Sequence, residues 1–193
     1  GSGLAKLHKT SSEYGNGCFG CEWDGFIGSN VQPGGWRKDW GSCFYELRLL
    51  PQLNSARNWG LQKNSIYQIS SKLVNYLNQH QPIACLVHGD LWSGNSFVQL
   101  DGKGILLDPA AWWADREVDI AMTKMFGGYS EKFYKSYQEI WPLPPTAKNR
   151  IEIYNFYHLL NHANLFGGSY CTQSLSFLSE LKSMFLDSNK FNY

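Results

Sequence analysis

The sequence feature that most limits the fold is a short stretch, residues 84–107, in which the spacing of apolar residues stops being helical. Residues 84–87 (ACLV) form a continuous apolar run, and residues 97–107 contain two apolar segments separated by a turn at Asp101 and Gly102. This pattern predicts a strand followed by a small β-hairpin. The segments on both sides have helical spacing, so we expect an α+β fold that is predominantly α-helical and contains one β island.

Apolar residues that recur every three or four positions predict helices on both sides of the island. Before it, we expect a helix over residues 39–57, with Asp39 as its N-cap and Pro51 as a kink or break, and a second helix over residues 65–81. After it, the expected helices span residues 117–126, 130–140, 146–166 and 172–186. The glycine-rich residues 15–35 predict a long irregular segment, the most mobile part of the chain.

Length and charge limit the classes of function. The chain has 193 residues, enough for one compact domain with a hydrophobic core. Its formal net charge is +1, and its 17 Lys and Arg and 16 Asp and Glu are scattered along the chain. The sequence therefore has no basic cluster of the kind that binds nucleic acid or a membrane surface. No apolar run approaches the length of about 18 residues that spans a bilayer, and the N-terminal residues lack the apolar core of a signal peptide. We therefore expect a soluble protein of the cytoplasm.

The cysteines support the same compartment. There are five of them, an odd number with irregular spacing, which argues against a secreted disulfide framework and favours reduced thiols. Cys18 and Cys21 form a C-x-x-C pattern, but no second pair accompanies it, so small packed side chains are a better interpretation than a zinc or redox site.

Acidic and amide side chains that can carry chemistry cluster within the β island. Residues 88–95 read HGDLWSGN, and Asp108 stands at the end of the expected hairpin. Kinase catalytic loops have the spacing His-x-Asp-x-x-x-x-Asn, in which the Asp receives the proton of the attacking hydroxyl and the Asn oxygen binds Mg²⁺. His88, Asp90 and Asn95 fit this spacing. In the same scheme, an Asp at the end of the following hairpin holds the metal ions that bridge the phosphates of ATP, the position of Asp108.

These residue types suit phosphoryl transfer, which needs a positioned hydroxyl and cations more than covalent help from the protein. Mg²⁺ prefers one or two carboxylates together with amide, water and phosphate oxygens. The alternative is that Asp90 caps a turn and Asp108 ends a strand, as isolated aspartates commonly do. The joint spacing of three such positions favours the phosphotransferase interpretation, with Asp90 as catalytic base and Asn95 and Asp108 as metal ligands.

Longer segments resemble signature segments of the fructosamine kinase (ketosamine-3-kinase) family. They read HGDLWSGN, DPAAWWADREVDIAMT, MFGGYSEKFYKSYQEIWPL and YHLLNHANLFGG, and the N-terminal part continues the match with LAKLHKTS and FIGSNVQPGGW. The resemblance implies a protein-kinase-like fold related to aminoglycoside phosphotransferases. It also implies ATP-dependent phosphorylation of a sugar hydroxyl on ketosamines, the glycation adducts of amines, which is interpreted as deglycation repair.

The resemblance also assigns residues by position. It implies Asp90 as the base, Asn95 and Asp108 as the metal ligands, and Trp92 and His162 as contacts to the sugar. For Trp92 the alternative is a core aromatic, and for His162 a packing histidine on a long helix. A run of charged residues after the hairpin is expected to form a hydrogen-bonded brace behind the catalytic loop: Asp115, Arg116, Glu117 and Asp119.

Parts of a working kinase are not recognised in the sequence. Kinases of this fold also need a glycine-rich loop over the phosphates and a strand Lys paired with a helix Glu, all in an N-terminal lobe. A Gly-x-Gly-x-x-Gly pattern at Gly15, Gly17 and Gly20 follows a helical pattern instead of a strand, so we interpret it as a chance match. In the family, the LAKLH segment follows the hinge between the lobes. We therefore expect residues 1–193 to form a single domain, the C-terminal lobe, without the nucleotide-binding lobe, and residues that bind the nucleotide stay unassigned.

Three functional readings remain open at this point. The first is a ketosamine kinase whose catalytic lobe is weak or inactive by itself. The second is a truncated, split or inactive kinase that binds a sugar-like ligand, self-associates, or pairs with a separately encoded N-terminal lobe. The third is a kinase of aminoglycosides or other amino sugars, because the same catalytic core serves those substrates too.

Overall fold

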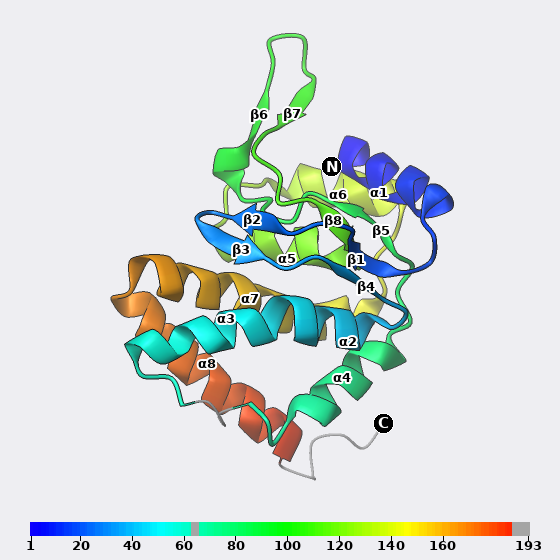
Figure 1. Ribbon diagram of the computed structural model, residues 1–193. Coiled ribbons are helices and arrows are strands. Elements are labelled where there is room, and N and C mark those ends of the chain that lie inside the picture. The colour runs from blue at the N-terminus through cyan, green and yellow to red at the C-terminus, as the bar shows by residue number, and fades with distance from the viewer. Residues whose placement is uncertain (63–65, 187–193) are drawn as a thin grey trace.

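The computed structural model, which describes residues 1–62 and 66–186, has helices packed around a small antiparallel sheet (Figure 1). The strand order in this sheet is β4-β1-β8-β5. Its strands are β1 (Phe19–Cys21), β4 (Gly35–Arg37), β5 (Cys85–Val87) and β8 (Trp112–Ala114). The strand expected at residues 84–87 is confirmed as β5, whereas β8 was not expected.

Residues 15–35 are not the irregular segment that their glycines predicted. They contain β1, β2 (Gly25–Ile27) and β3 (Asn30–Gln32), and they reach the start of β4. Glycine is needed here because strands approach closely: a Cβ on Gly20 would lie 1.9 Å from the carbonyl oxygen of Gly35. Three-residue strands are too short to show an alternating pattern, so the glycines alone predict turns here. The expectation of an irregular segment is wrong.

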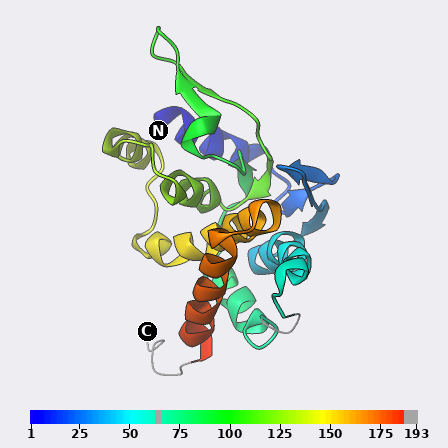
Figure 2. The same cartoon turned by 90° about the vertical axis from the view of Figure 1, so that its left-hand side faces the viewer.

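The expected hairpin is present and projects from the body of the molecule (Figures 1 and 2). It consists of β6 (Ser96–Val98) and β7 (Gly104–Leu106), paired antiparallel. Gly102 adopts a φ of +84°, and its N–H donates to the carbonyl oxygen of Gln99 at 2.9 Å, which confirms the turn.

Four helices after the hairpin confirm the predicted pattern to within three residues at each end. They are α5 (Glu117–Met125), α6 (Glu131–Ile140), α7 (Lys148–Phe166) and α8 (Ser169–Leu186), with a 3₁₀ turn at Pro145–Ala147. Gly167 and Gly168, which separate the last two, have φ of +64° and +60°, values that favour glycine and end α7. Helix α7 packs against both α5 and α8.

The helices before the island differ more from the prediction. They are α1 (Ser2–Tyr14), α2 (Trp40–Phe44), a π-helical turn (Tyr45–Leu49), α3 (Leu50–Ser55), a 3₁₀ turn (Ala56–Trp59) and α4 (Ser70–Gln79). Asp39 is the expected N-cap, because its Oδ1 accepts from the N–H of Ser42 at 2.9 Å. Pro51 does not break the helix: it lies in the first turn of α3, where its missing N–H has little effect. Ser65, the expected start of the next helix, lies outside the described residues.

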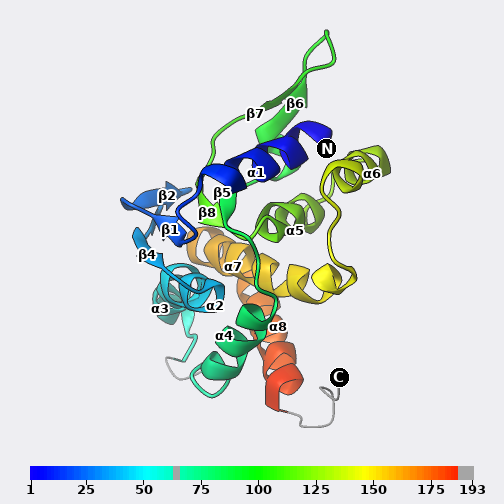
Figure 3. The same cartoon turned by 90° about the vertical axis from the view of Figure 1, so that its right-hand side faces the viewer.

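Two hydrophobic clusters hold these elements together. The larger one joins the sheet to α2, α3, α4, α7 and α8, and at its centre the rings of Trp40 and Trp112 stack with centroids 5.6 Å apart. The smaller one joins α1, α5 and α6, which lie side by side in Figure 3, to the loop after β5, and consists of Leu4, Ala5, Leu91, Ile120 and Tyr137. Because Leu91 follows Asp90 directly, this second cluster fixes one side of the loop that carries the candidate base.

Two further observations bear on the sequence predictions. The five cysteines are all free thiols. Among the described residues, no helix is long and apolar enough to cross a lipid bilayer.

Candidate active site

The loop after β5 is held from behind by a buried carboxylate of α5. Asp119 is fully buried, its Oδ2 accepts from the N–H of His88 at 2.8 Å, and its Oδ1 accepts from the N–H of Gly89 at 2.8 Å. Gly89 has a φ of +82°, and a Cβ there would lie 2.2 Å from the carbonyl oxygen of Ala110, so only glycine fits. Asp90 is therefore presented from a backbone that is fixed on both sides. The predicted brace behind the loop is confirmed for Asp119.

Asn95 lies against Asp90 as the spacing predicted. Residues Ser93–Asn95 form a 3₁₀ turn, which brings the Asn95 amide back to the start of the loop. Its Nδ2 donates to the carbonyl oxygen of Asp90 at 2.9 Å and, more weakly, to the carboxylate Oδ2 at 3.4 Å. Because the nitrogen is used in this way, the amide oxygen Oδ1 is left as the group that can bind a cation.

The hairpin returns Asp108 to the same place. The N–H of Leu107 donates to the carbonyl oxygen of Asn95 at 2.9 Å, and Nε2 of His88 donates to the carbonyl oxygen of Leu107 at 2.8 Å. Asp108 itself has a φ of +51°, a left-handed conformation that is uncommon for a residue with a side chain. Within the described residues its carboxylate accepts no hydrogen bond. Asp90, Asn95 and Asp108 are thus brought together, and the last of them carries an uncommitted carboxylate.

The charged groups around Asp90 change the affinity of its carboxyl group for a proton. Burial raises the pKa of the Asp90 carboxyl above its ordinary value, and the negative charge of Asp108 adds to the increase. His162, His88 and the hydrogen bond from Asn95 act in the opposite direction. A carboxylate whose proton affinity is raised at the mouth of a loop is a suitable acceptor for the proton of a hydroxyl group.

His162 lies near Asp90 and also packs as a helical histidine, so both sequence interpretations describe part of its environment. Its Nδ1 lies 2.8 Å from the carbonyl oxygen of His158. Since a carbonyl can only accept, Nδ1 carries a proton and Nε2 remains for another partner. Its ring packs among three aromatic rings at centroid distances of 5.0 to 5.6 Å: Phe126, Phe166 and Tyr170.

Trp92 is not a core aromatic, because 41% of it is exposed. Its ring lies over Gly94, where a Cβ would come within 2.2 Å of the indole. The hydroxyl of Tyr129 donates to the Trp92 carbonyl oxygen at 3.3 Å and lies 2.8 Å from Oγ of Ser96, which fixes the backbone below the ring. A flat apolar surface two residues after the candidate base is thereby kept open to solvent.

A family model described as fructosamine kinase matches residues 1–184. The chain belongs to the fructosamine kinase family. Among its relatives, a probable ketoamine kinase of Vibrio vulnificus is 42% identical over 165 residues, which is 86% of this chain and 57% of the relative. A probable ketoamine kinase of Synechocystis is 41% identical over 180 residues, which is 93% of this chain and 60% of the relative.

Solved structures agree with the family. A protein of Haemophilus somnus assigned as a fructosamine-3-kinase superposes with a TM-score of 0.83 at 31% identity, covering 92% of this chain and 60% of that one. A protein of Thermobifida fusca with the same assignment superposes with a TM-score of 0.78 at 32% identity, covering 91% of this chain and 61% of that one. These matches confirm the protein-kinase-like, predominantly helical α+β fold. The chain spans about three fifths of the length of the relatives it matches.

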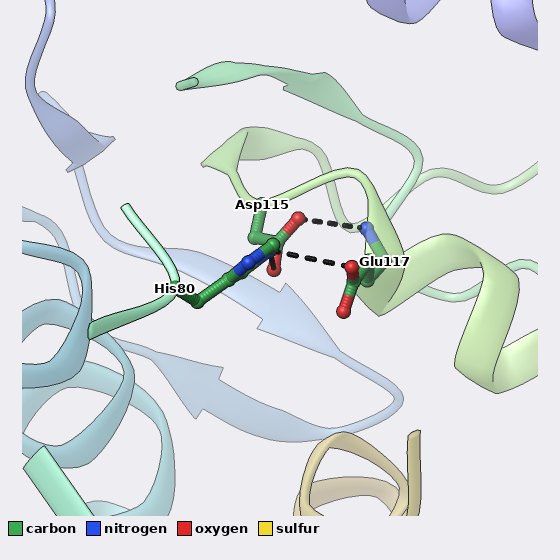
Figure 4. Close-up of side chains that lie close together, drawn as sticks. All are labelled: His80, Asp115 and Glu117. Atoms are coloured by element: carbon green, nitrogen blue, oxygen red, sulfur yellow. Dashed lines mark hydrogen bonds and ion pairs between the residues drawn. The ribbon is translucent and has the colours of Figure 1, made fainter. Parts of the chain in front are cut away.

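A second cluster of charged side chains, shown in Figure 4, is fully committed to the protein. Nε2 of His80 lies 3.2 Å from Oδ2 of Asp115 and 3.3 Å from Oε1 of Glu117, and Arg150 donates to both oxygens of Glu117 at 2.7 and 2.8 Å. The second oxygen of Asp115 accepts from the N–H of Glu117 at 3.0 Å, and Oδ2 accepts from the Tyr154 hydroxyl at 2.7 Å. We call His80, Asp115, Glu117 and Arg150 the buried ion cluster.

The buried ion cluster contains ligand types that could hold a metal ion, since one ligand atom each from His80, Asp115 and Glu117 lies within 4.8 Å of the others. Every carboxylate oxygen already accepts a hydrogen bond, however, and two cationic side chains balance two carboxylates. Burial lowers the pKa of His80, but the hydrogen bonds from its ring to the two carboxylates outweigh this and raise it to about 9. The cluster therefore works as an ion-pair brace between α4, α5 and α7.

The sequence predicted Asp115 and Glu117 as part of a brace behind the candidate loop, whereas they join α4, α5 and α7; it missed His80 because a lone histidine at a helix end has no distinguishing pattern. Arg116 reaches the loop only indirectly, through the Tyr137 hydroxyl 3.4 Å from its Nη1. Its guanidinium donates to the carbonyl oxygens of Trp141 and Pro142 and stacks over the Trp141 ring at 4.1 Å. The Gly15, Gly17 and Gly20 pattern, as expected, follows a helix, α1, and ends inside β1.

A large cavity lies beside the candidate site. Its volume is about 780 Å³, and it opens between the start of α1, the hairpin and the start of α6. Its walls are mostly apolar, with Leu4, Leu7, Phe97, Leu106 and Phe133 among them, and Ser93 and Ser96 connect it to the catalytic loop. Several hairpin side chains next to it are exposed, including Val98 and Leu100.

Proposed function

We propose that this chain carries the catalytic centre of an ATP-dependent ketoamine kinase, which transfers the γ-phosphoryl group to a sugar hydroxyl of a glycated amine. The observation that carries the proposal is the proximity of Asp90, Asn95 and Asp108 on two neighbouring loops, in a chain whose relatives are named probable ketoamine kinases. In this proposal the phosphorylation marks the sugar adduct for removal, which is deglycation repair.

Asp90 orients the attacking hydroxyl and receives its proton. The Nδ2 hydrogen bonds from Asn95 hold the Asp90 backbone and carboxylate, so the proton acceptor is preorganised before substrate binds. The raised pKa of Asp90 increases its affinity for that proton.

The oxygens of Asn95 and Asp108 fit Mg²⁺. They are hard ligands of different loops, and the Asp108 carboxylate is uncommitted within the described residues. The strained φ of Asp108 is consistent with a backbone that presents its carboxylate for a purpose other than packing. When bound, Mg²⁺ supplies positive charge that stabilises the transferring phosphoryl group.

Trp92 and His162 supply the sugar contacts in this proposal. The exposed indole offers a flat surface on which a sugar ring can stack, and Nε2 of His162 can hydrogen-bond a sugar hydroxyl near Asp90. The bound molecule is a ketosamine or a related amino sugar.

We further propose that residues 1–193 alone are a weak or inactive kinase. No phosphate-binding glycine loop or paired lysine is recognised in them, and such groups stabilise the transition state by orders of magnitude. An N-terminal nucleotide-binding lobe, or a polypeptide equivalent to it, docks on the exposed hairpin and the adjacent cavity, and without it the same apolar surface promotes self-association. The reaction takes place in the cytoplasm, where ATP is available and thiols stay reduced.

The test is ATP-dependent phosphorylation of a fructosyl amine, followed by ³¹P NMR of the product. Residues 1–193 are assayed alone and with the N-terminal lobe of a related ketoamine kinase, and light scattering records the oligomeric state of each sample. We expect turnover only in the second sample and loss of that turnover in Asp90→Asn. Glu46→Gln is the matched control, because Glu46 is an exposed carboxylate outside the loop and the hairpin, paired with Arg37 at 2.6 Å.

Other outcomes separate the remaining readings. Binding of the fructosyl amine without turnover in either sample would favour a sugar-binding module that is not an enzyme. Faster phosphorylation of an aminoglycoside than of the fructosyl amine would favour a kinase of amino sugars. Robust turnover by residues 1–193 alone would contradict the proposed need for a second lobe, and a monomer at high concentration would contradict the self-association.

A further inference from the structure

A histidine on the first helix, His8, lies outside the catalytic loop but is bonded to the residue that holds it. His8 is fully buried, and its Nε2 lies 3.0 Å from Oδ2 of Asp119. The same Oδ2 accepts from the N–H of His88, and Oδ1 accepts from the N–H of Gly89. Residues from three distant segments, α1, α5 and the loop after β5, therefore meet at one carboxylate.

The direction of each hydrogen bond can be worked out from the groups involved. Nδ1 of His8 lies 2.8 Å from the hydroxyl oxygen of Tyr137 on α6. Nη1 of Arg116, which can only donate, lies 3.4 Å from the same oxygen, so the hydroxyl proton is free to point at Nδ1. Nε2 then carries the imidazole proton and donates it to Asp119. The chain of donors runs from Arg116 through Tyr137 and His8 to Asp119, and it ends at the catalytic loop.

Asp119 needs this donor because it is a buried anion. Burial raises the pKa of the Asp119 carboxyl, but the hydrogen bonds from His8, His88 and Gly89 outweigh burial and keep it below its ordinary value. Without His8, Oδ2 keeps only the His88 amide as a donor. A carboxylate with fewer donors can rotate or take up a proton, and either change weakens its hold on the two loop amides.

We propose that His8 is a positioning residue for the catalytic loop, acting through Asp119, with Tyr137 fixing the imidazole tautomer. The proposal rests on the proposed function only because that function makes Asp90 the proton acceptor. The hydrogen-bonded unit itself is independent of any reaction. It also links the loop to α1, the helix that contributes Leu4 and Leu7 to the large cavity.

The experiment measures amide hydrogen exchange by NMR in residues 1–193 and needs no kinase activity. The decisive pair is His8→Gln and His8→Asn, two polar side chains that differ in reach. The glutamine amide can take the place of Nε2 and donate to Asp119, whereas the shorter asparagine amide cannot. We expect His8→Asn to speed exchange at His88 and Gly89 about tenfold more than at the amides of β5, and His8→Gln to retain most of the protection.

Two further variants separate positioning from packing. Leu73→Ala removes buried volume from α4, in the larger hydrophobic cluster and outside the polar chain, so it is expected to speed exchange at the loop and at β5 by the same factor. Tyr137→Phe removes only the outer hydrogen bond, and its effect on the loop amides is expected to be smaller than that of His8→Asn. If His8→Asn changes the loop and β5 equally, as Leu73→Ala does, His8 is a packing residue and the proposal fails.

A kinetic readout keeps this proposal distinct from the proposed function. In the active two-lobe sample, His8→Asn should lower kcat about tenfold or more and leave KM for ATP unchanged, because a misplaced Asp90 affects the chemical step. Selective loss of loop protection without any Asp90-dependent turnover would support the positioning role and contradict the kinase assignment. Unchanged loop protection together with intact Asp90-dependent turnover would contradict the positioning role of His8 and support the kinase assignment.

Discussion

The candidate active site and the buried ion cluster are built from the same kinds of side chain, and they differ in how fully those side chains are satisfied. In the ion cluster, every carboxylate oxygen of Asp115 and Glu117 accepts a hydrogen bond from the chain. In the active site, Asp108 is exposed and accepts none from the described residues, and Asp90 has a weak 3.4 Å bond to its carboxylate. Unsatisfied oxygens are available for a ligand, whereas satisfied ones stabilise the fold.

This difference predicts that the two regions respond oppositely to substitution. The largest expected effect is on activity. In the two-lobe sample, Asp90→Asn should lower kcat by about two to four orders of magnitude, because it removes the proton acceptor, and should change the free energy of unfolding by less than about 1 kcal/mol. Single-turnover kinetics and urea denaturation measure the two quantities. An Asp90→Asn variant with wild-type kcat would remove the basis for calling this region the active site.

The buried ion cluster should show the reverse behaviour. Glu117→Ala leaves Arg150 without its partner in a buried setting, so we expect the free energy of unfolding to fall by about 3–5 kcal/mol. The matched control is Glu46→Ala, whose pair with Arg37 is exposed and should contribute about 0–1 kcal/mol. Urea titrations of both variants provide the comparison, and similar losses in the two would show that burial does not distinguish these ion pairs.

The pH dependence of stability tests the same cluster. The pKa of His80 is raised from 6.5 to about 9 in the folded chain, so folding favours its protonated form. Its contribution is therefore complete below pH 6.5 and is lost as the pH rises through about 9. The stability difference between the wild type and His80→Gln, measured from pH 6 to pH 10, should shrink over this range. A constant difference would mean that His80 is not protonated in the cluster.

The smallest expected effect is the one of replacing the exposed Trp92. Trp92→Ala should raise KM for the fructosyl amine about tenfold and leave stability nearly unchanged, because its ring is exposed beside the loop. Trp40→Ala is the contrasting variant: Trp40 is buried and donates to the Tyr154 hydroxyl at 2.9 Å, so its loss should destabilise the chain by about 3–5 kcal/mol. Equal destabilisation by the two substitutions would show that Trp92 packs in the core, and would contradict its proposed contact with the sugar.

The parts of the fold that the sequence predicted are those whose signals are local. Asp39 caps its helix three residues away, the hairpin turns at Gly102, and four consecutive helices follow their own apolar spacing. The strands in residues 15–35 were missed because each has only three residues and because β1 also pairs with a distant strand, Gly20 with Trp113 of β8. A strand of three residues carries too little pattern of its own to be detected without its neighbours.

The candidate site likewise has a part that the sequence predicted and a part that it did not. The sequence by itself determined the order of chemical groups in residues 88–108, because a catalytic loop and its hairpin are close along the chain. The sequence could not determine which carboxylates lack hydrogen-bond donors, because the donors lie far away along the chain: His8 donates to Asp119, and His80 donates to Glu117. Only the tertiary structure decided this, since burial and hydrogen-bond partners arise when α1, α4, α5 and α7 pack together.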